Sequence, residues 1–179
     1  YEIIEDRRCL EKDFNKIVRG MAYPYGTYND AVVEMIKNSG ICYSRTDHST
    51  HNFEMPTDWL RLPATCHHDD PMLMELADKF LTDPNCGKWS PKMFYLWGHS
   101  YEFEEHDNWN VIEEFAAKMA NHDDIWYATN IEIYDYQDAF KRLEFDTDMT
   151  KCYNPNAMPM WFKCEDKDYK VNPGETISL

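Results

Sequence analysis

The sequence predicts an α/β fold, with a parallel sheet and helices in residues 1–143 and a small antiparallel β appendage in residues 144–179. Three observations predict it. A strand, a turn, a helix and a second strand follow one another between residues 17 and 44, the order of a parallel βαβ unit. Residues 92–97 form an aromatic, apolar run that ends at Gly98. In the last segment, short strand-like runs alternate with turn signals.

The first quarter of the chain alternates helix and strand. Pro24-Tyr25-Gly26 is a turn signal that stops the first strand. Asn29 is a good N-cap for the next helix, and Gly40 suits the left-handed residue that follows a helix. The expected elements are a helix at residues 2–14, a strand at 17–23, a helix at 30–38 and a strand at 41–44.

The middle of the chain continues the alternation around the aromatic strand at residues 92–98. Because its positions are mostly apolar, we expect both faces of this strand to be buried. Pro71 suits the first turn of the helix before it. The remaining expected elements are a polar loop at residues 47–58, strands at 60–62 and 124–128, and helices at 72–81, 104–119 and 132–143.

The character of the chain changes after residue 143. Turn signals at Asn154-Pro155, residues 165–168 and Pro173-Gly174 separate short β-type runs, which is typical of antiparallel hairpins. The expected strands are residues 151–153, 160–164, 169–171 and 176–179. We therefore expect one domain to span residues 1–143 and a β appendage to span 144–179.

Charge excludes several classes of partner. The 179 residues carry a net charge of −15, with an isoelectric point near 4.7. No basic patch is present to neutralise phosphates, so nucleic acid and anionic membrane surfaces are not expected partners. No apolar run approaches the ~18 residues of a membrane span. A neutral or cationic ligand, such as a carbohydrate or an amino sugar, is compatible with this charge.

The cysteines indicate a compartment. Six are present, at positions 9, 42, 66, 86, 152 and 164, and no two form a Cys-x-x-Cys pair. An even number permits disulfides, but this spread favours isolated, mostly buried thiols. It therefore favours a reducing compartment, the cytoplasm.

Three polar clusters fall where predicted strands end, at residues 23–26, 66–69 and 98–100. Because parallel strands finish on one face of a sheet, we expect the three clusters to line one site. His99 directly follows Gly98 at the end of the aromatic strand. It is the first candidate for a functional residue, against the alternative of a histidine that is hydrogen-bonded in a loop.

The adjacent His67 and His68 raise the question of a metal site. Neighbouring residues on an extended strand point to opposite sides, so this pair is not expected to bind one ion. The alternative is that one histidine lines a cleft while the other packs or caps. The other histidines lie among polar residues and are expected to be solvated; they are His48, His51, His106 and His122.

Three stretches carry a resemblance to a known family: GMAYPYGTYN at residues 20–29, WGHS at 97–100 and DDIWYAT at 123–129. The chain resembles the C-terminal two-thirds of the polysaccharide deacetylase (NodB-homology, carbohydrate esterase) family, especially bacterial members with an extra C-terminal β segment. The resemblance implies a distorted (β/α)7-type barrel, incomplete in this chain. It also implies a hydrolase that removes acetyl groups from N- or O-acetylated sugars with a metal-activated water.

The resemblance also implies roles for residues. Pro24-Tyr25-Gly26 matches the family's third motif, in which the tyrosine backbone N–H helps to hold the oxyanion, a contribution that can be worth ~3 kcal/mol. His99 matches the histidine of the fifth motif, the general acid that protonates the leaving amine or alkoxide. Substrate contacts are expected from Tyr23, Pro24, His67, His68 and Trp97.

Departures from the family pattern concern mainly the metal. The third motif's arginine falls at Ala22, the fifth motif's leucine falls at Trp97, and the fourth motif would lie near residues 66–69. The first motif, with the base and a metal-binding Asp, has no counterpart, nor does the His-x-x-x-His pair of the second. His48 and His51 are one residue too close to replace that pair. The intact family enzyme requires a divalent metal such as Zn²⁺ or Co²⁺, and none is expected for this chain alone.

Two rival functions follow from the missing motifs. The first is a non-catalytic carbohydrate-binding module, with Tyr25, Tyr28, Trp97 and Tyr101 as a sugar-stacking platform; the alternative use of such aromatics is core or rim packing. The second is a barrel fragment that depends on an oligomer, because unpaired strand edges need a cover. A homo-oligomer is its expected form.

Overall fold

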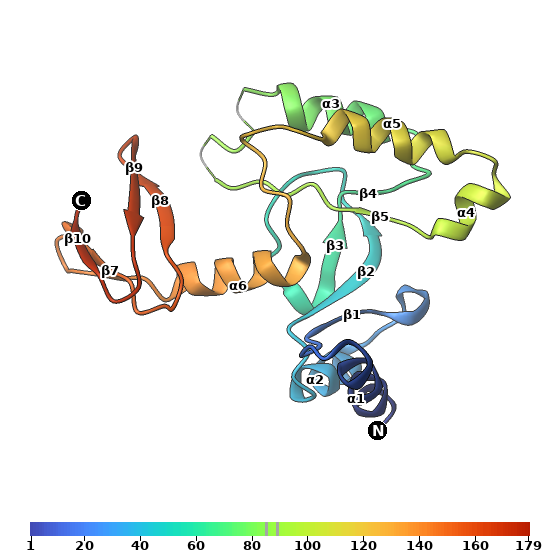
Figure 1. Cartoon of the computed structure of the whole chain (residues 1–179), viewed down its shortest axis with the longest axis horizontal. Helices are drawn as coiled ribbons and strands as arrows, with labels where there is room; N and C mark the ends of the chain where they lie inside the picture. Colours follow the sequence, from blue (N-terminus) through green and yellow to red (C-terminus); the bar gives the residue numbers. More distant parts are fainter. Residues whose placement is uncertain (85, 89) are drawn as a thin grey trace. The chain divides into compact units, whose positions relative to one another are not determined.

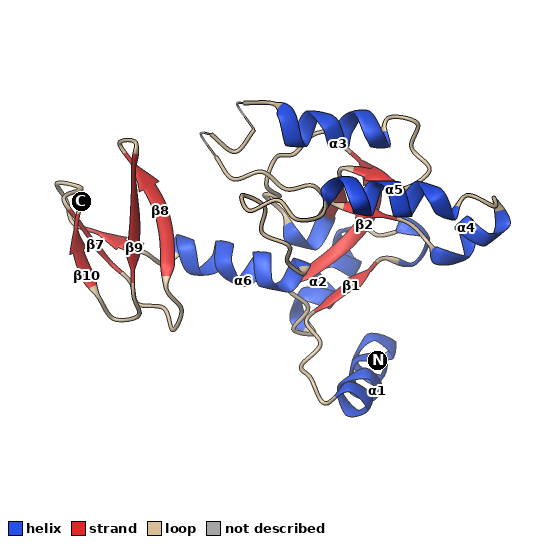
Figure 2. Ribbon diagram, turned by 45° about the horizontal axis from the view of Figure 1, so that its top comes forward, coloured by secondary structure: helices blue, strands red, loops and turns tan. Residues whose placement is uncertain are grey.

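A computed structural model describes residues 1–84, 86–88 and 90–179 and divides the chain into two compact units, Tyr1–Tyr127 and Ala128–Leu179 (Figure 1). Both helices and sheets are present, so the predicted α/β class is confirmed (Figure 2). The described strands form no closed barrel. The division lies before the expected boundary at residue 143, because the last helix packs with the C-terminal strands.

The described residues of the first unit contain five α-helices and two 3₁₀ turns. They are α1 (Glu2–Phe14), η1 (Pro24–Gly26), α2 (Asp30–Asn38), η2 (Trp59–Arg61), α3 (Leu73–Thr82), α4 (Ser100–Glu105) and α5 (Trp109–Met119). The bounds of α1 and α2 agree with those predicted, and the Asn29 side chain caps α2 by accepting a hydrogen bond from the Val32 amide at 2.9 Å. The single helix expected at residues 104–119 is wrong: Asp107, with φ 50°, separates α4 from α5.

The strands of the first unit run parallel in the order of the sequence. β1 (Gly20–Ala22) pairs with β2 (Tyr43–Ser49), which pairs with β3 (Leu62–Ala64), while β4 (Cys66–His67) pairs with β5 (Leu96–Trp97). Only Thr65 separates β3 from β4 along the chain. Its carbonyl accepts from the His51 amide at 2.9 Å and its amide donates to the Tyr95 carbonyl at 2.8 Å, so the two small sheets share one segment.

Two hydrophobic clusters hold this sheet to its helices. One joins Tyr23 and Ile41 to Val33 and Ile36 of α2. The other contains Phe53, Cys66, Leu73 and Leu76, with partly buried side chains of α5 packed against it. The clusters anchor β1 and β4 and so fix where those strands end.

Three strand predictions are wrong and one is incomplete. The strand expected at residues 60–62 is displaced, because residues 59–61 form η2 and β3 begins at Leu62. Residues 92–97 are half-buried rather than buried on both faces, and only Leu96 and Trp97 pair as strand. Residues 124–128 form no strand. β2 begins near its expected place but continues to Ser49, which puts His48 in a strand rather than in a loop.

The second unit confirms the antiparallel prediction. It contains α6 (Asn130–Lys141), β6 (Glu144–Phe145), β7 (Lys151–Tyr153), β8 (Met160–Cys164), β9 (Lys167–Val171) and β10 (Thr176–Ser178). β7 pairs with β6 and with β10, and β8 and β9 form a hairpin, all antiparallel. Ala139 of α6 packs with Cys152, Met160 and Val171 in the core of this unit.

Two further sequence expectations concern the whole chain. All six cysteines are free thiols, with Cys66 and Cys152 buried. Burial raises the pKa of the Cys66 thiol to about 12, which keeps it protonated and unreactive. Within the described residues, no helix combines the length and the apolar character needed to cross a bilayer.

A buried asparagine organises the second unit. Asn154 is 0% exposed, and its side-chain amide donates to the carbonyls of Met158 at 2.9 Å and Val171 at 3.0 Å. Its side-chain oxygen accepts from the Asn156 backbone and side chain at 3.0 Å and 2.9 Å. Each buried polar group that loses its partner costs about 1–3 kcal/mol, so this network stabilises the loop between β7 and β8.

We predict that Asn154→Ala lowers the free energy of unfolding of the second unit by about 2–4 kcal/mol, because the buried Val171 carbonyl loses its donor and the buried Asn156 loses its acceptor. Amide hydrogen exchange, followed peptide by peptide, should show protection lost across β7, β8 and β9. Asn130→Ala, at the first position of α6, is the control, with an expected change within about 0.5 kcal/mol. Equal protection in both variants would contradict the structural role of Asn154.

Candidate functional site

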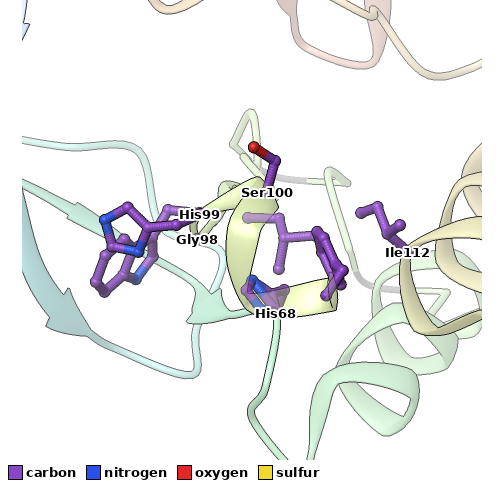
Figure 3. Close-up of a pocket in the computed structure, with 8 residues that line it drawn as sticks. His68, Gly98, His99, Ser100 and Ile112 are labelled. Atoms are coloured by element: carbon purple, nitrogen blue, oxygen red, sulfur yellow. The ribbon is translucent and has the colours of Figure 1, made fainter. Parts of the chain in front are cut away.

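The candidate site lies at the carboxyl ends of β4 and β5. His67 is the last residue of β4 and His68 follows it, while Gly98 and His99 follow β5 and lead into α4. His68, Gly98 and His99 are labelled in Figure 3. The His68 amide donates to the Trp97 carbonyl at 2.9 Å, which extends the pairing of the two segments beyond the strands. Two of the three predicted polar clusters therefore meet, as expected for parallel strands.

The carboxylate of Glu102 lies close to three histidines. Glu102 Oε2 lies 3.2 Å from His99 Nδ1, 3.3 Å from His67 Nε2 and 3.5 Å from His68 Nε2. The same oxygen accepts a hydrogen bond from the His99 backbone amide at 2.9 Å. Burial raises the pKa of Glu102, but the hydrogen bonds from His99 and the charges of the histidines outweigh it and lower the pKa, so the group is a carboxylate at neutral pH.

Glu102 was missed by the sequence interpretation. Its signal is its spacing: a glutamate three residues after the residue that precedes a helix closes back on that residue's backbone, as in a capping box. Here the helix is the short α4 and the residue is His99. The expectation that residues 104–119 form the helix placed Glu102 outside it and hid this relation.

His67 and His68 lie together, contrary to the expectation that they point apart. Their ring centroids are 4.2 Å apart. The alternation of an extended strand ends at His67, and His68 already belongs to the following turn. His67 Nδ1 accepts from the Asp69 amide at 3.2 Å, which leaves the proton of the neutral ring on Nε2, facing Glu102.

His68 is the buried member of the group. Its side chain is 2% exposed and lies against the Phe103 ring, with centroids 4.2 Å apart. Burial lowers the pKa of His68, and the neighbouring His67 lowers it further, so the ring is neutral at pH 7. Its Nε2 is 3.2 Å from Asp69 Oδ1, yet neither ring nitrogen has a partner in hydrogen-bond geometry. The short distance to Asp69 is therefore not a hydrogen bond, and both ring nitrogens of His68 stay without a partner.

His99 and Trp97 form the exposed side of the cluster. The side chain of His99 is 46% exposed, and its ring lies between those of Trp97 and Tyr101, at centroid distances of 5.8 Å and 5.3 Å. Trp97 also contacts the His67 ring and carries the Arg45 guanidinium 4.3 Å from its centroid. An open hollow of about 260 Å³ beside them is lined by His68, Gly98, His99 and Phe103, among others.

The third predicted cluster lies at the end of β1, where the Tyr23 amide donates to the carbonyl of Arg45, the residue whose guanidinium lies over Trp97. Tyr25 is 99% exposed and has φ 55°, an unusual backbone conformation for a tyrosine, next to Pro24. Tyr23 is only 3% exposed, and its hydroxyl donates to the Leu60 carbonyl at 2.8 Å. Tyr23 was expected to contact substrate; its ring packs in the core with Val33 and Ile36 of α2.

The other histidines are partly as expected. His48 is exposed, as predicted for a solvated residue. His51 is exposed but contacts Asp70, with Nε2 2.6 Å from Oδ2, and His106 Nδ1 lies 3.3 Å from Asp69 Oδ2. The edge of the sheet therefore holds more imidazole–carboxylate pairs than the sequence interpretation assigned to it.

No protein-family model, no curated protein and no solved structure matches this chain. The resemblance to the polysaccharide deacetylase family thus stays a prediction.

We predict that Gly98→Ala displaces His68. A Cβ on Gly98 would lie 1.9 Å from His68 Nδ1, and Phe103 packs against the His68 ring. Overpacking of this kind typically costs about 1–3 kcal/mol. Urea denaturation should show this loss, and the ring signals of His68 should shift in NMR spectra.

The matched control is Gly87→Ala. Gly87 has φ +75° and no atom within 4 Å of its added Cβ, so this variant carries a backbone cost without a clash. If Gly98→Ala costs no more than the control and leaves the His68 signals in place, the close approach of Gly98 to His68 is contradicted.

Proposed function

We propose that this chain belongs to a hydrolase that removes acetyl groups from N- or O-acetylated sugars, and that His99 is its general acid. The observation that carries the proposal is the pair formed by His99 and Glu102 at the carboxyl edge of a parallel sheet, with Nδ1 3.2 Å from Oε2. Active sites on parallel sheets lie at this edge. The resemblance of the sequence to the deacetylase family supplies the reaction class.

The pair suits proton donation. Glu102 accepts from Nδ1 of His99, which fixes the ring and leaves Nε2 to exchange a proton with a bound ligand. In the imidazolium form, His99 gives its Nε2 proton to the leaving amine or alkoxide as the bond to the acyl carbon breaks, and the Glu102 carboxylate stabilises the charged ring beforehand. A general acid of this kind contributes typically about 10²–10⁴-fold in rate.

Tyr25 supplies a donor for the oxyanion in this proposal. The turn of η1 uses the amides of Gly26 and Thr27, which donate to the carbonyls of Tyr23 and Pro24. The Tyr25 amide donates to no group among the described residues. Tyr25 itself is 99% exposed. A backbone amide aimed at developing negative charge is worth about 3 kcal/mol.

An open parallel sheet with strands in sequence order is compatible with an incomplete (β/α)7-type barrel. In the family a divalent metal activates the attacking water, but the Asp and His-x-x-x-His motifs that hold it have no counterpart in this sequence. The residues of this chain thus act on the carbonyl oxygen and on the leaving group.

A second candidate is a carbohydrate-binding module without catalysis. The exposed rings of Tyr25 and Tyr101, at 99% and 57%, favour it, because aromatic faces stack on sugar rings. The two candidates differ in one measurable respect: the module binds acetylated sugar without releasing acetate.

We predict that His99→Ala lowers acetate release about 10²–10⁴-fold in the natural polypeptide that carries this sequence, with little change in sugar affinity or thermal midpoint. Acetate release from N-acetylated and O-acetylated oligosaccharides measures turnover, and calorimetry measures affinity. His48→Ala, an exposed histidine at the end of β2, is the control.

Three outcomes are decisive. Loss of turnover in His99→Ala alone supports the proposal. Intact turnover per folded molecule with a lowered midpoint would give His99 a structural role only. Sugar binding without any acetate release in the unsubstituted protein would favour the binding module.

A further inference from the structure

Two imidazoles and one carboxylate converge beside the His99–Glu102 pair. One ligand atom each from His67, His68 and Glu102 lies within 4.8 Å of the other two. His67 and His68 are adjacent at the end of β4, whereas Glu102 lies in α4, and the parallel pairing of β4 with β5 brings these two segments together. Such a spacing suits donors around a single ion rather than three independent contacts.

A second observation points to a ligand at this place. His68 is 2% exposed, and neither of its ring nitrogens has a hydrogen-bond partner among the described residues. A buried polar group left without a partner costs about 1–3 kcal/mol, so native proteins satisfy such groups with a side chain, a water or an ion. The Nε2 atom faces the Glu102 and Asp69 carboxylates, at 3.5 Å and 3.2 Å.

We propose that His67, His68 and Glu102 bind a first-row transition-metal dication of the zinc class. Two imidazoles and a carboxylate are a donor set that Zn²⁺ takes in proteins, whereas Mg²⁺ and Ca²⁺ take oxygen donors almost alone. This site departs from the expectation that the chain binds no metal by itself, and it uses none of the family's metal motifs.

Neighbouring groups hold Glu102 and His68 in a state that suits metal binding. The His99 backbone amide donates to Glu102 Oε2 and orients that carboxylate, as outer-shell partners do in metal sites. His68 lies in an apolar setting beside Phe103, which favours the neutral ring that a metal requires.

His67 must change to bind the ion. Its Nε2 carries the proton as long as Nδ1 accepts from the Asp69 amide, at 3.2 Å. Metal binding at Nε2 requires the proton of the neutral ring to sit on Nδ1, so the hydrogen bond from the Asp69 amide is lost. The bond is long, so its loss is a small cost beside the two or more coordinate bonds gained.

The test is calorimetric titration of the metal-stripped chain with Zn²⁺, with elemental analysis after dialysis. We expect one Zn²⁺ per chain and a raised thermal midpoint, because binding to the folded state alone stabilises it. His67→Ala and His68→Phe should weaken binding by more than about 100-fold, since the loss of an outer-shell partner alone costs about 10–100-fold. His48→Ala should bind as the unsubstituted chain does, and Mg²⁺ should give no titration.

His67 is partly exposed, so His67→Ala is the variant expected to fold normally, and circular dichroism checks both variants. Absence of Zn²⁺ binding in the unsubstituted chain overturns the proposal. So does binding that persists in His67→Ala or that weakens equally in His48→Ala. Because acetate release plays no part in this test, its outcome is independent of the role proposed for His99.

Discussion

The candidate site depends on one oxygen atom. Glu102 Oε2 accepts the His99 backbone amide at 2.9 Å and lies within 3.5 Å of a ring nitrogen of each of three histidines. Through it, the start of α4 is tied to the ends of both β4 and β5. The hydrogen bonds from His99 and the charges of the histidines keep this carboxylate ionised, and it faces the ring nitrogens of His67 and His99. Both proposed activities, proton donation and metal binding, use that charge.

The backbone makes this arrangement accessible. Thr65 lies between β3 and β4 and hydrogen-bonds both to His51, just after β2, and to Tyr95, just before β5. Because β4 and β5 pair in parallel, His67, His68 and His99 lie at the same edge of the sheet. Gly98 then allows the His68 ring to approach the backbone more closely than any residue with a Cβ would permit. His68 is buried and neither of its ring nitrogens has a hydrogen-bond partner among the described residues, which suits the ring to bind a ligand.

Local signals predicted much of this fold. The N-cap at Asn29 located α2, and turn residues located the hairpin of β8 and β9. Parallel pairing placed the histidines at residues 67, 68 and 99 together. What failed depended on tertiary contacts: Tyr23 pairs its hydroxyl with Leu60 in the core, and the left-handed Asp107 divides a helix whose apolar pattern was continuous. Glu102 lay just before the predicted helix, so its bond to His99 could not be anticipated.

The most direct test of the central claim is the tautomeric state of the histidines, measured by ¹⁵N NMR in the metal-free chain. If Glu102 organises the cluster, neutral His67 carries its proton on Nε2 and neutral His99 carries its proton on Nδ1, since these atoms face Oε2. Glu102→Gln should then change both rings and leave the exposed His48 unaltered. Rings of His67 and His99 that average between tautomers as free imidazole does, and that ignore Glu102→Gln, would contradict the account.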